Sequence, residues 1–451
     1  MGPSNNPFIS EYADHTTLHP VGLAALILLS AAVMAARRGL VTPALLAMAC
    51  FVPSAQRIVI LGADFDFLRI LALFGLVRTF IRGEIHRVRW NGLDSVVTMW
   101  AMAGLVIPVI RLGPDVLMNR LGECYTILVT YFAVRATVSE WRDLEKLSVA
   151  LAILSFPVAC FAAVEWTTAR NLFAVFGGVP EVTGIREGRL RCQGAFGHPI
   201  LAGCFWASAL PLLVGLWWQK RRLLAACSIG AALFIIASCA SATPVVGILV
   251  ALCSACLYPA RHSLWLMRWG VVCLLCIMHL IMNAPVWHLI ARTSVLGGSS
   301  WHRFALVDGA ITHFDEWWLI GSTVGSAHWG HFTFDVTNLY IVQALHGGLL
   351  LLALFIAMFG SGFRQIARAL NHTEDEGTRL VIWCIGTSLA VHAFNVFGVS
   401  YFGQTAASLY ITLGVVGSLR GIAESAYGGA GATKARTPWL SADHVLIASG
   451  S

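Results

Sequence analysis

Arginine is the residue whose placement in this chain most clearly indicates chemistry. Arg186, Arg189 and Arg191 lie close together in one polar segment, Arg303 lies in a second one, and neither segment contains lysine. A guanidinium group donates two parallel hydrogen bonds to an oxyanion, whereas the lysine ammonium is only a point charge. These arginines therefore predict a site for a strongly negative group. The alternative is that they pair with the acidic residues of the same segments, which are Glu165, Glu181, Glu187, Asp308 and Asp315.

Histidine and cysteine give weaker signals. His328 and His331 have a spacing that could hold a metal ion, but no third ligand follows at a fixed distance. Packing of these rings among interfacial aromatic residues is the simpler interpretation. Two CxxC pairs between residues 253 and 276 lie in apolar runs, where cysteine packs as a small apolar side chain. The sequence therefore predicts neither a metal site nor a cofactor.

The composition indicates the class of protein that must position these groups. Of 451 residues, 57% are hydrophobic and only 12% are charged. At about 20 residues per crossing, this is enough for around a dozen membrane-spanning helices. A water-soluble domain is excluded, and a chain this apolar offers no soluble basic face for nucleic acid despite its net charge of +7. We expect an all-α polytopic membrane protein whose surroundings are the lipid bilayer.

Thirteen apolar spans follow one another along the chain. Their approximate bounds are 21–36, 41–56, 66–81, 94–110, 121–137, 147–164, 199–218, 223–240, 244–260, 265–284, 337–360, 380–398 and 404–420. The second span is the least regular, because Pro53 and Arg57 interrupt it. If the N-terminus lies outside, every short inner loop is basic, as the positive-inside rule requires. The turn Lys220, Arg221 and Arg222 is an example.

This topology divides the chain into six regions and places the C-terminus inside. The second long outer segment precedes the third-last helix, is rich in tryptophan and histidine, and has an amphipathic stretch, so we expect it to fold on the outer membrane surface. The regions are N-terminal helices 1–164, a first outer segment 165–198, central helices 199–284, the large outer segment 285–336, C-terminal helices 337–420 and a flexible inner tail 421–451.

Two motifs resemble a known family. Residues 191–199 read RCQGAFGHP and open a predicted span. This string, with Gly194, His198 and Pro199, resembles the R..G.F.HPN signature of the O-antigen ligase and O-antigen polymerase superfamily, although Ile200 replaces the usual asparagine.

The second motif lies downstream. Arg303 and the turn containing Gly321 and Gly325 resemble the R..L......(P)..G.G segment of the same family. Asn338 and Gly348 fall where the family has HN.Y and E.G at the start of the next helix. The likeness covers roughly residues 190 to 360.

The resemblance implies a fold of the GT-C type of membrane glycosyltransferase. It implies transfer of a glycan from a polyprenyl (undecaprenyl) diphosphate carrier to a glycan, lipid or protein acceptor, in the biosynthesis of O-antigen, exopolysaccharide or another surface polysaccharide. The site would face the periplasm from the bacterial inner membrane. Fixed cations are needed where charge builds up on the diphosphate leaving group, and the motifs assign this role to Arg191 and Arg303, with Arg186 and Arg189 beside them.

Two departures affect the expected catalytic residues. The family's histidine aligns with Thr337, whose hydroxyl cannot act as a base, and its glutamate aligns with His346. Asp335 is the nearest group able to accept a proton, so we place catalysis at Asp335, Thr337 and Asn338. Alternatively, Asp335 only caps the following helix. We expect His346, about two turns deeper, to pack or bond between helices.

Two functions remain open. The first is a glycosyltransferase, with a polymerase slightly favoured over a ligase. The second is a membrane protein that binds or transports the carrier-linked glycan without chemistry. A transporter would favour charged and helix-breaking residues near mid-membrane in paired halves. Charge within the spans is scarce here and the motifs gather at one face, so the sequence favours the enzyme.

Overall fold

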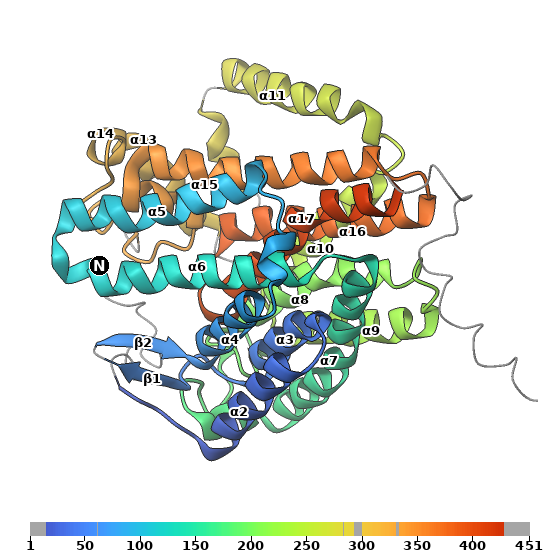
Figure 1. The fold of residues 1–451 in the computed structure, drawn as a ribbon. Coiled ribbons are helices and arrows are strands. Elements are labelled where there is room, and N and C mark those ends of the chain that lie inside the picture. Colours follow the sequence, from blue (N-terminus) through green and yellow to red (C-terminus); the bar gives the residue numbers. More distant parts are fainter. Residues whose placement is uncertain (1–14, 61, 283, 293–299, 331–332, 428–451) are drawn as a thin grey trace, which may run out of the picture.

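The computed structural model describes residues 15–60, 62–282, 284–292, 300–330 and 333–427, and it is almost entirely helical (Figure 1). Each of the thirteen predicted spans coincides with one long helix. These helices are α2 (Pro20–Ala35), α3 (Val41–Phe51), α4 (Phe67–Ile81), α5 (Gly92–Leu112), α6 (Leu117–Thr137), α7 (Trp141–Thr168), α8 (Pro199–Gly215), α9 (Arg222–Ser238), α10 (Ala242–Cys256), α11 (Leu264–Ile281), α15 (Leu339–Asn371), α16 (Glu376–Gly398) and α17 (Gly403–Tyr427).

Short elements connect the long helices. The segment 285–336, predicted to lie outside, contains η6 (Val286–His288), α12 (Leu289–Arg292), α13 (Ser300–Thr312) and α14 (Phe314–Trp317) among its described residues. Two antiparallel hairpins lie elsewhere, β1 (Arg57–Ile60) with β2 (Ala63–Asp66) and β3 (Ile185–Arg186) with β4 (Arg189–Leu190). The remaining short helices are η1 (Arg38–Leu40), η2 (Glu84–Arg87), η3 (Pro114–Val116), η4 (Leu172–Phe176) and η5 (Arg261–Ser263).

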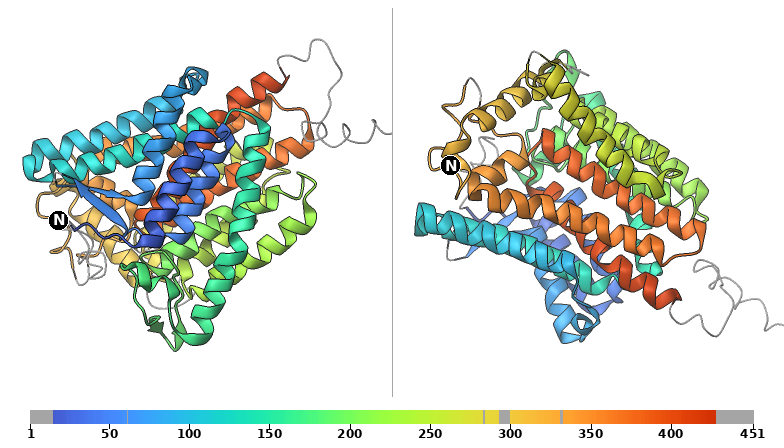
Figure 2. Two further views of the ribbon diagram at one scale, coloured as in Figure 1. Left: turned by 60° about the horizontal axis from the view of Figure 1, so that its bottom comes forward. Right: turned by 90° about the horizontal axis from the view of Figure 1, so that it is seen from above.

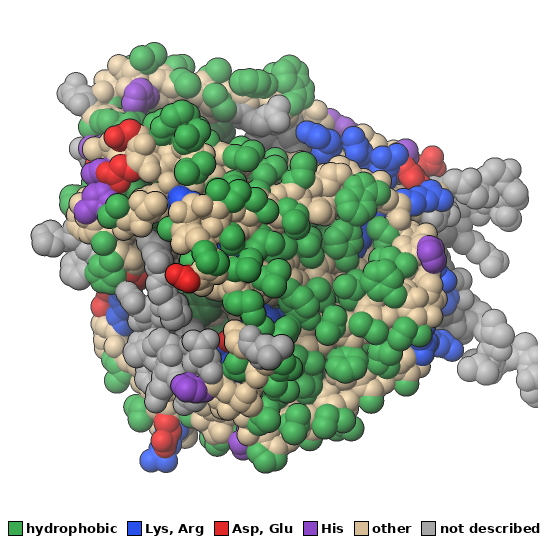
Figure 3. Space-filling model, turned by 60° about the vertical axis from the view of Figure 1, so that its left-hand side comes forward, with side chains coloured by type: hydrophobic (Ala, Val, Ile, Leu, Met, Phe, Trp, Pro, Cys, Tyr) green, Lys and Arg blue, Asp and Glu red, His purple; other side chains and the backbone are tan. Residues whose placement is uncertain are grey.

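Apolar composition makes these helices suited to a membrane. Five are long and apolar enough to cross one, namely α5, α7, α15, α16 and the Gly403–Glu424 part of α17, and six shorter helices are also apolar. Hydrophobic side chains cover the middle of the face shown in Figure 3, whereas most of the visible lysine and arginine lies toward one edge and most of the visible histidine toward the other. The structure is therefore that of an all-α protein built for an apolar environment.

Helix α8 forms the centre of the packing. Nearly all of its side chains are buried, including the fully enclosed Phe205 and Trp206. It packs against α7, α9, α10 and α16, while α5, α6, α15 and α17 pack together beside it. Figures 1 and 2 show α13 and α14 at one end of the molecule and the last turns of α17 at the opposite end. Helix α11 runs apart from the other long helices, with mostly exposed side chains.

Several boundaries differ from the sequence prediction, and α15, for example, continues to Asn371 where an end at 360 was predicted. The predicted span 41–56 is helical only to Phe51, because the chain turns at Pro53 and continues as strand β1. Arg57, which interrupted that span, pairs with Asp64 across the hairpin. At the other end of the chain, α17 continues beyond residue 420 to Tyr427, so the predicted flexible tail cannot start at 421. The rest of that tail, 428–451, lies outside the described residues.

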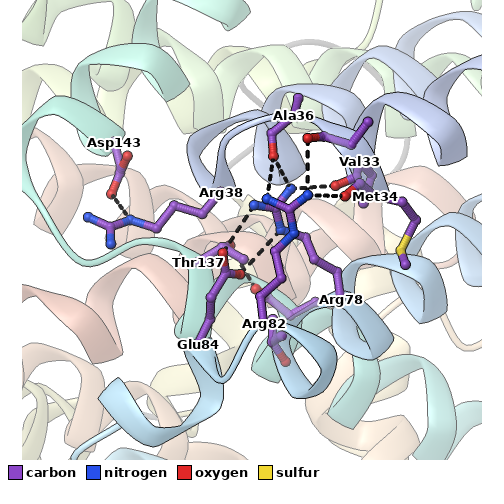
Figure 4. A network of polar contacts seen from close by, with 12 residues as sticks. Val33, Met34, Ala36, Arg38, Arg78, Arg82, Glu84, Thr137 and Asp143 are labelled. Atoms are coloured by element: carbon purple, nitrogen blue, oxygen red, sulfur yellow. Dashed lines mark hydrogen bonds and ion pairs between the residues drawn. The ribbon is translucent and has the colours of Figure 1, made fainter.

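Arginines brace the end of the molecule at which α2 stops (Figure 4). The Arg78 side chain is buried, pairs with Glu84 at 3.0 Å and donates to the carbonyls of Val33 and Ala36. Arg82 donates to the Met34 carbonyl at 2.6 Å. The last carbonyls of a helix have no partner within it and carry partial negative charge, so both cations stabilise the C-terminus of α2.

Candidate functional site

A buried carboxylate shapes the loop that carries the first motif. Glu165, near the C-terminal end of α7, is only 2% exposed. Its oxygens accept hydrogen bonds from the backbone nitrogens of Gln193 (3.0 Å) and Gly194 (2.9 Å) and from the Thr183 hydroxyl (3.1 Å). Glu165 therefore holds both ends of the β3–β4 hairpin and is not the arginine partner that its position in the sequence suggested.

The hairpin presents three of the predicted arginines. Arg186 and Arg189 face each other across the two strands and are exposed. Arg191 follows β4 and is half-buried, and burial, with a contribution from Arg186, lowers the pKa of its guanidinium. Its Nε atom is buried without a hydrogen-bond partner, and no carboxylate among the described residues forms an ion pair with Arg191. Glu187 acts on Arg191 only from a distance and pairs instead with Arg186 at 3.8 Å, so the half-buried cation has no direct anionic partner among these residues.

Arg303 reaches the same region from α13. Its Nη2 atom donates to the Thr243 hydroxyl at the start of α10, at 2.9 Å. Burial lowers the pKa of Arg303, and Arg186 lowers it further. Cys192, next to Arg191, donates its backbone N–H to the Ser238 carbonyl at the end of α9, at 3.0 Å, so the segments that carry Arg191 and Arg303 meet at the turn between α9 and α10. The two motif arginines, distant in sequence, therefore belong to one basic cluster, which we define as Arg186, Arg191 and Arg303.

His198 lies beside this basic cluster and is the N-cap of α8. Its Nδ1 accepts a hydrogen bond from the backbone nitrogen of Ile200 at 3.2 Å, and Pro199 occupies the first helical position. Burial, together with Arg191 and Arg186, lowers the pKa of His198 to about 4. The imidazole is thus neutral at physiological pH and adds no further positive charge to the site.

The predicted catalytic segment adjoins the basic cluster. His302, next to Arg303 in sequence, lies with its Nε2 3.0 Å from the backbone oxygen of Asp335. On the other side of Asp335, the Ser400 hydroxyl donates to the Val336 carbonyl at 2.6 Å. The Asp335 carboxylate is exposed and has no hydrogen bond or ion pair to any residue that the structure describes. Thr337 is half-buried.

Asn338, rather than Asp335, caps α15. Its side-chain oxygen accepts hydrogen bonds from the backbone nitrogens of Tyr340 (3.0 Å) and Ile341 (3.4 Å). The prediction that Asp335 serves as the N-cap is therefore wrong: Asp335 is three residues too early, because the chain becomes helical only at Leu339. The placement of Asn338 among the catalytic residues also weakens, since its side chain is buried and already engaged.

Glycines of the second motif lie on both sides of a break in α15. Helix α15 has non-helical backbone at Gly347 and Gly348, and the turn 317–322 packs into this gap. Leu349 donates to the Trp318 carbonyl at 2.8 Å, and Ser322 donates to the Leu345 carbonyl at 2.9 Å. A methyl group on Gly321 would lie 2.3 Å from that carbonyl oxygen. All of the predicted motif glycines have positive φ, namely Gly194, Gly321, Gly325 and Gly348.

A second group of cations lies at the broken helix. Arg111 of α5 donates to the carbonyls of Ile320 and Leu345, both at 2.9 Å. Arg120 of α6 contacts both ring nitrogens of His346, at 3.2 and 3.3 Å, and pairs with Glu123 at 2.8 Å. His346 thus bonds between helices, as the sequence predicted. It does not contribute to the pKa shift of Arg191 or of Arg303.

Sequence reasoning missed several residues that complete the site. His302 and Ser400 anchor the Asp335 segment, and Gly398 approaches Thr243 and Arg303 so closely that a Cβ atom there would lie 3.5 Å from the Arg303 Nε. No spacing in the sequence connects the loop after α16 with α10 or α13. The alternative in which His328 and His331 together hold a metal ion cannot be followed, because His331 lies outside the described residues.

A scan of protein-family models matches none to this chain, and a search of curated proteins finds no significant match.

Proposed function

We propose that this protein is a membrane glycosyltransferase that transfers or polymerises a glycan from a polyprenyl diphosphate carrier, as in the O-antigen ligase and polymerase superfamily that its motifs resemble. The proposal places thirteen spans in the bacterial inner membrane, with the N-terminus and the site on the periplasmic side. One observation carries it: the segments that bear Arg191 and Arg303 meet at the turn between α9 and α10. Arg186 pairs with Glu187 at 3.8 Å, but no carboxylate forms an ion pair with Arg191 or Arg303 in the part of the chain that the structure describes.

The chemistry follows from these charges. In the reaction the acceptor hydroxyl oxygen bonds to the anomeric carbon of the sugar while the bond from that carbon to the diphosphate oxygen breaks. The departing diphosphate gains negative charge, which the guanidinium groups of Arg191 and Arg303 stabilise. The acceptor proton passes to the exposed carboxylate of Asp335. The backbone oxygen of Asp335 lies 3.0 Å from Nε2 of His302, the residue before Arg303 in sequence.

Lysine substitution tests the arginines. Arg191→Lys and Arg303→Lys keep the charge but lose the two-pronged donor, so we expect glycan transfer in cells to fall by about tenfold or more while the protein remains inserted and abundant. Arg170→Lys is the matched control, because Arg170 is exposed in the same outer segment and lies 3.9 Å from Glu181. Normal product from both site variants would overturn the proposal.

Substitution of Asp335 tests the base. Because Asn338 caps α15, loss of capping does not complicate the result. Asp335→Asn should abolish most transfer without changing the melting temperature, since the amide cannot accept the proton. An active Asp335→Asn variant would remove Asp335 from the mechanism and leave catalysis to the arginines alone.

Glycan length in a deletion strain separates the two reaction types. Loss of long chains, with single units still on the acceptor, identifies the polymerase that we favour. Long chains left on the carrier identify a ligase. Transport without chemistry is tested by adding purified protein, carrier-linked glycan and acceptor to vesicles. Movement of the glycan across the vesicle membrane without a new glycosidic bond would show that the protein is a transporter and not an enzyme.

A further inference from the structure

Three potential metal ligands meet in the large outer segment, away from the basic cluster. His313 lies between α13 and α14, Glu316 belongs to α14, and His328 lies in the following loop. Their ligand atoms all lie within 4.8 Å of one another. His328 Nε2 is already 2.8 Å from one Glu316 oxygen and 3.0 Å from the other. The sequence had suggested no third ligand for His328, because His313 and Glu316 approach it only through the fold.

The surroundings hold the three groups in a ligating arrangement. His313 Nδ1 lies 3.1 Å from the Gly309 carbonyl, a contact that places the proton on Nδ1 and leaves the lone pair on Nε2. Trp329 stacks on the His313 ring at 5.6 Å with an interplanar angle of 13°. The same tryptophan donates its Nε1 proton to Glu316 at 3.2 Å. Metal-binding histidines and carboxylates usually have such supporting contacts.

We propose that His313, Glu316 and His328 bind a divalent transition-metal ion, with zinc the best match. Two imidazoles and one carboxylate are ligands that zinc accepts, at about 2.0–2.2 Å, and three protein ligands leave one position for water. Glu316 and His328 are exposed and His313 is half-buried, so the side chains can rotate to close the remaining distance.

The ion would act as a brace and not as a reactant. It would join the end of α13, the helix that carries Arg303, to the loop that leads to Asp335. That loop is closed by two hydrogen bonds between Ser326 and Thr333, at 2.6 and 2.7 Å. The proposed ion therefore holds together the two halves of the outer segment, and this inference stands independently of the glycan reaction.

Metal titration of the full-length protein in nanodiscs tests the proposal. The cysteines are first alkylated, so that exposed thiols such as Cys253 and Cys256 cannot bind the ion. Zn²⁺ binding is measured by equilibrium dialysis, Co²⁺ by its visible absorption, and the melting temperature with and without metal. The variants are His313→Gln, Glu316→Gln and His328→Gln. His288→Gln is the control, since His288 lies 3.5 Å from Asp308 in the same segment.

We expect one tightly bound ion per chain, a tetrahedral Co²⁺ spectrum and a higher melting temperature with zinc. Each ligand variant should weaken binding by about tenfold or more and lose the shift in melting temperature, whereas His288→Gln should keep both. Absence of a stoichiometric site in the unsubstituted protein would overturn the proposal, as would ligand variants that bind as tightly as that protein. The unsubstituted titration decides the question if a variant fails to fold.

Discussion

Arginines in this protein differ in how their charge is balanced. Arg135 pairs with the fully buried Asp94 at 3.1 Å, and Arg78 pairs with Glu84. Arg191 is half-buried beside a second arginine and has no such partner among the described residues. A buried cation is costly unless an anion compensates it. We therefore assign Arg78 and Arg135 to stability, and this contrast supports the proposal that Arg191 binds an anion.

Glu165 provides the first prediction at the level of single residues. Glu165→Gln keeps the size of the side chain but replaces one of the two accepting oxygens by a donor that faces backbone N–H groups. We expect a loss of about 1–3 kcal/mol in the free energy of unfolding, together with reduced glycan transfer because the Arg191 loop loosens.

Thermal unfolding in detergent measures the stability. Glu181→Gln is the control, because Glu181 is exposed and its contact with Arg170 at 3.9 Å contributes little. If the two variants unfold at the same temperature, Glu165 does not hold the loop.

His198 provides a pH prediction. Its pKa falls from the ordinary value of 6.5 to about 4 in the folded protein. Between these values the unfolded chain binds a proton that the folded chain does not, so this residue makes stability decrease as pH falls from 6.5 toward 4. Asn can cap the helix without titrating, so His198→Asn should show a smaller decrease in melting temperature across this range. An identical decrease in both proteins would contradict the assigned cause.

At the level of elements, the break in α15 creates a charged end within the bundle. The first part of α15 ends at His346, and its last carbonyls carry partial negative charge. Arg111 of α5 supplies a compensating cation by donating to the Leu345 carbonyl, while Arg120 of α6 contacts the His346 ring. The break is therefore a built feature that joins α15 to the turn 317–322 and to two neighbouring helices.

Glycine substitution tests this feature. Gly348 has φ of +66°, and an added Cβ atom would lie 2.4 Å from the Leu319 carbonyl oxygen. Gly348→Ala should cost about 2 kcal/mol or more, because backbone must move at a position with left-handed conformation. Gly360→Ala in the same helix meets no atom within 4 Å and should be neutral or slightly stabilising. Equal melting temperatures for the two variants would show that the break is not rigid.

At the level of the whole molecule, the prediction concerns orientation. Val324 is 73% exposed in the large outer segment, and Lys220 is exposed in the turn between α8 and α9. Gln219 beside it is buried and would label poorly. In a background without exposed native cysteines, Val324→Cys should react with an impermeant thiol reagent in intact cells, and Lys220→Cys only after permeabilisation. The reverse result would invert the topology and place the basic cluster on the cytoplasmic side.

The helices were predictable because their signals are local. Runs of apolar residues mark all thirteen long helices, and Pro199 after His198 marks the start of α8. Their ends were less predictable: Pro53 stops α3 early, while residues 421–427, beyond the predicted span, remain helical in α17. Hydropathy marks which residues suit the apolar core of a membrane, and a helix commonly continues past the last of them.

The candidate site depends on contacts that no local pattern contains. Thr243 meets Arg303 because the first turns of α10 and α13 lie together, and Glu165 binds the loop at Gly194 because α7 stops beneath it. The motif strings picked out the arginines by their chemical type. Their shared environment, and the approach of His313 to His328, arise only when distant segments pack, because side-chain distances across a bundle are set by the helices between them.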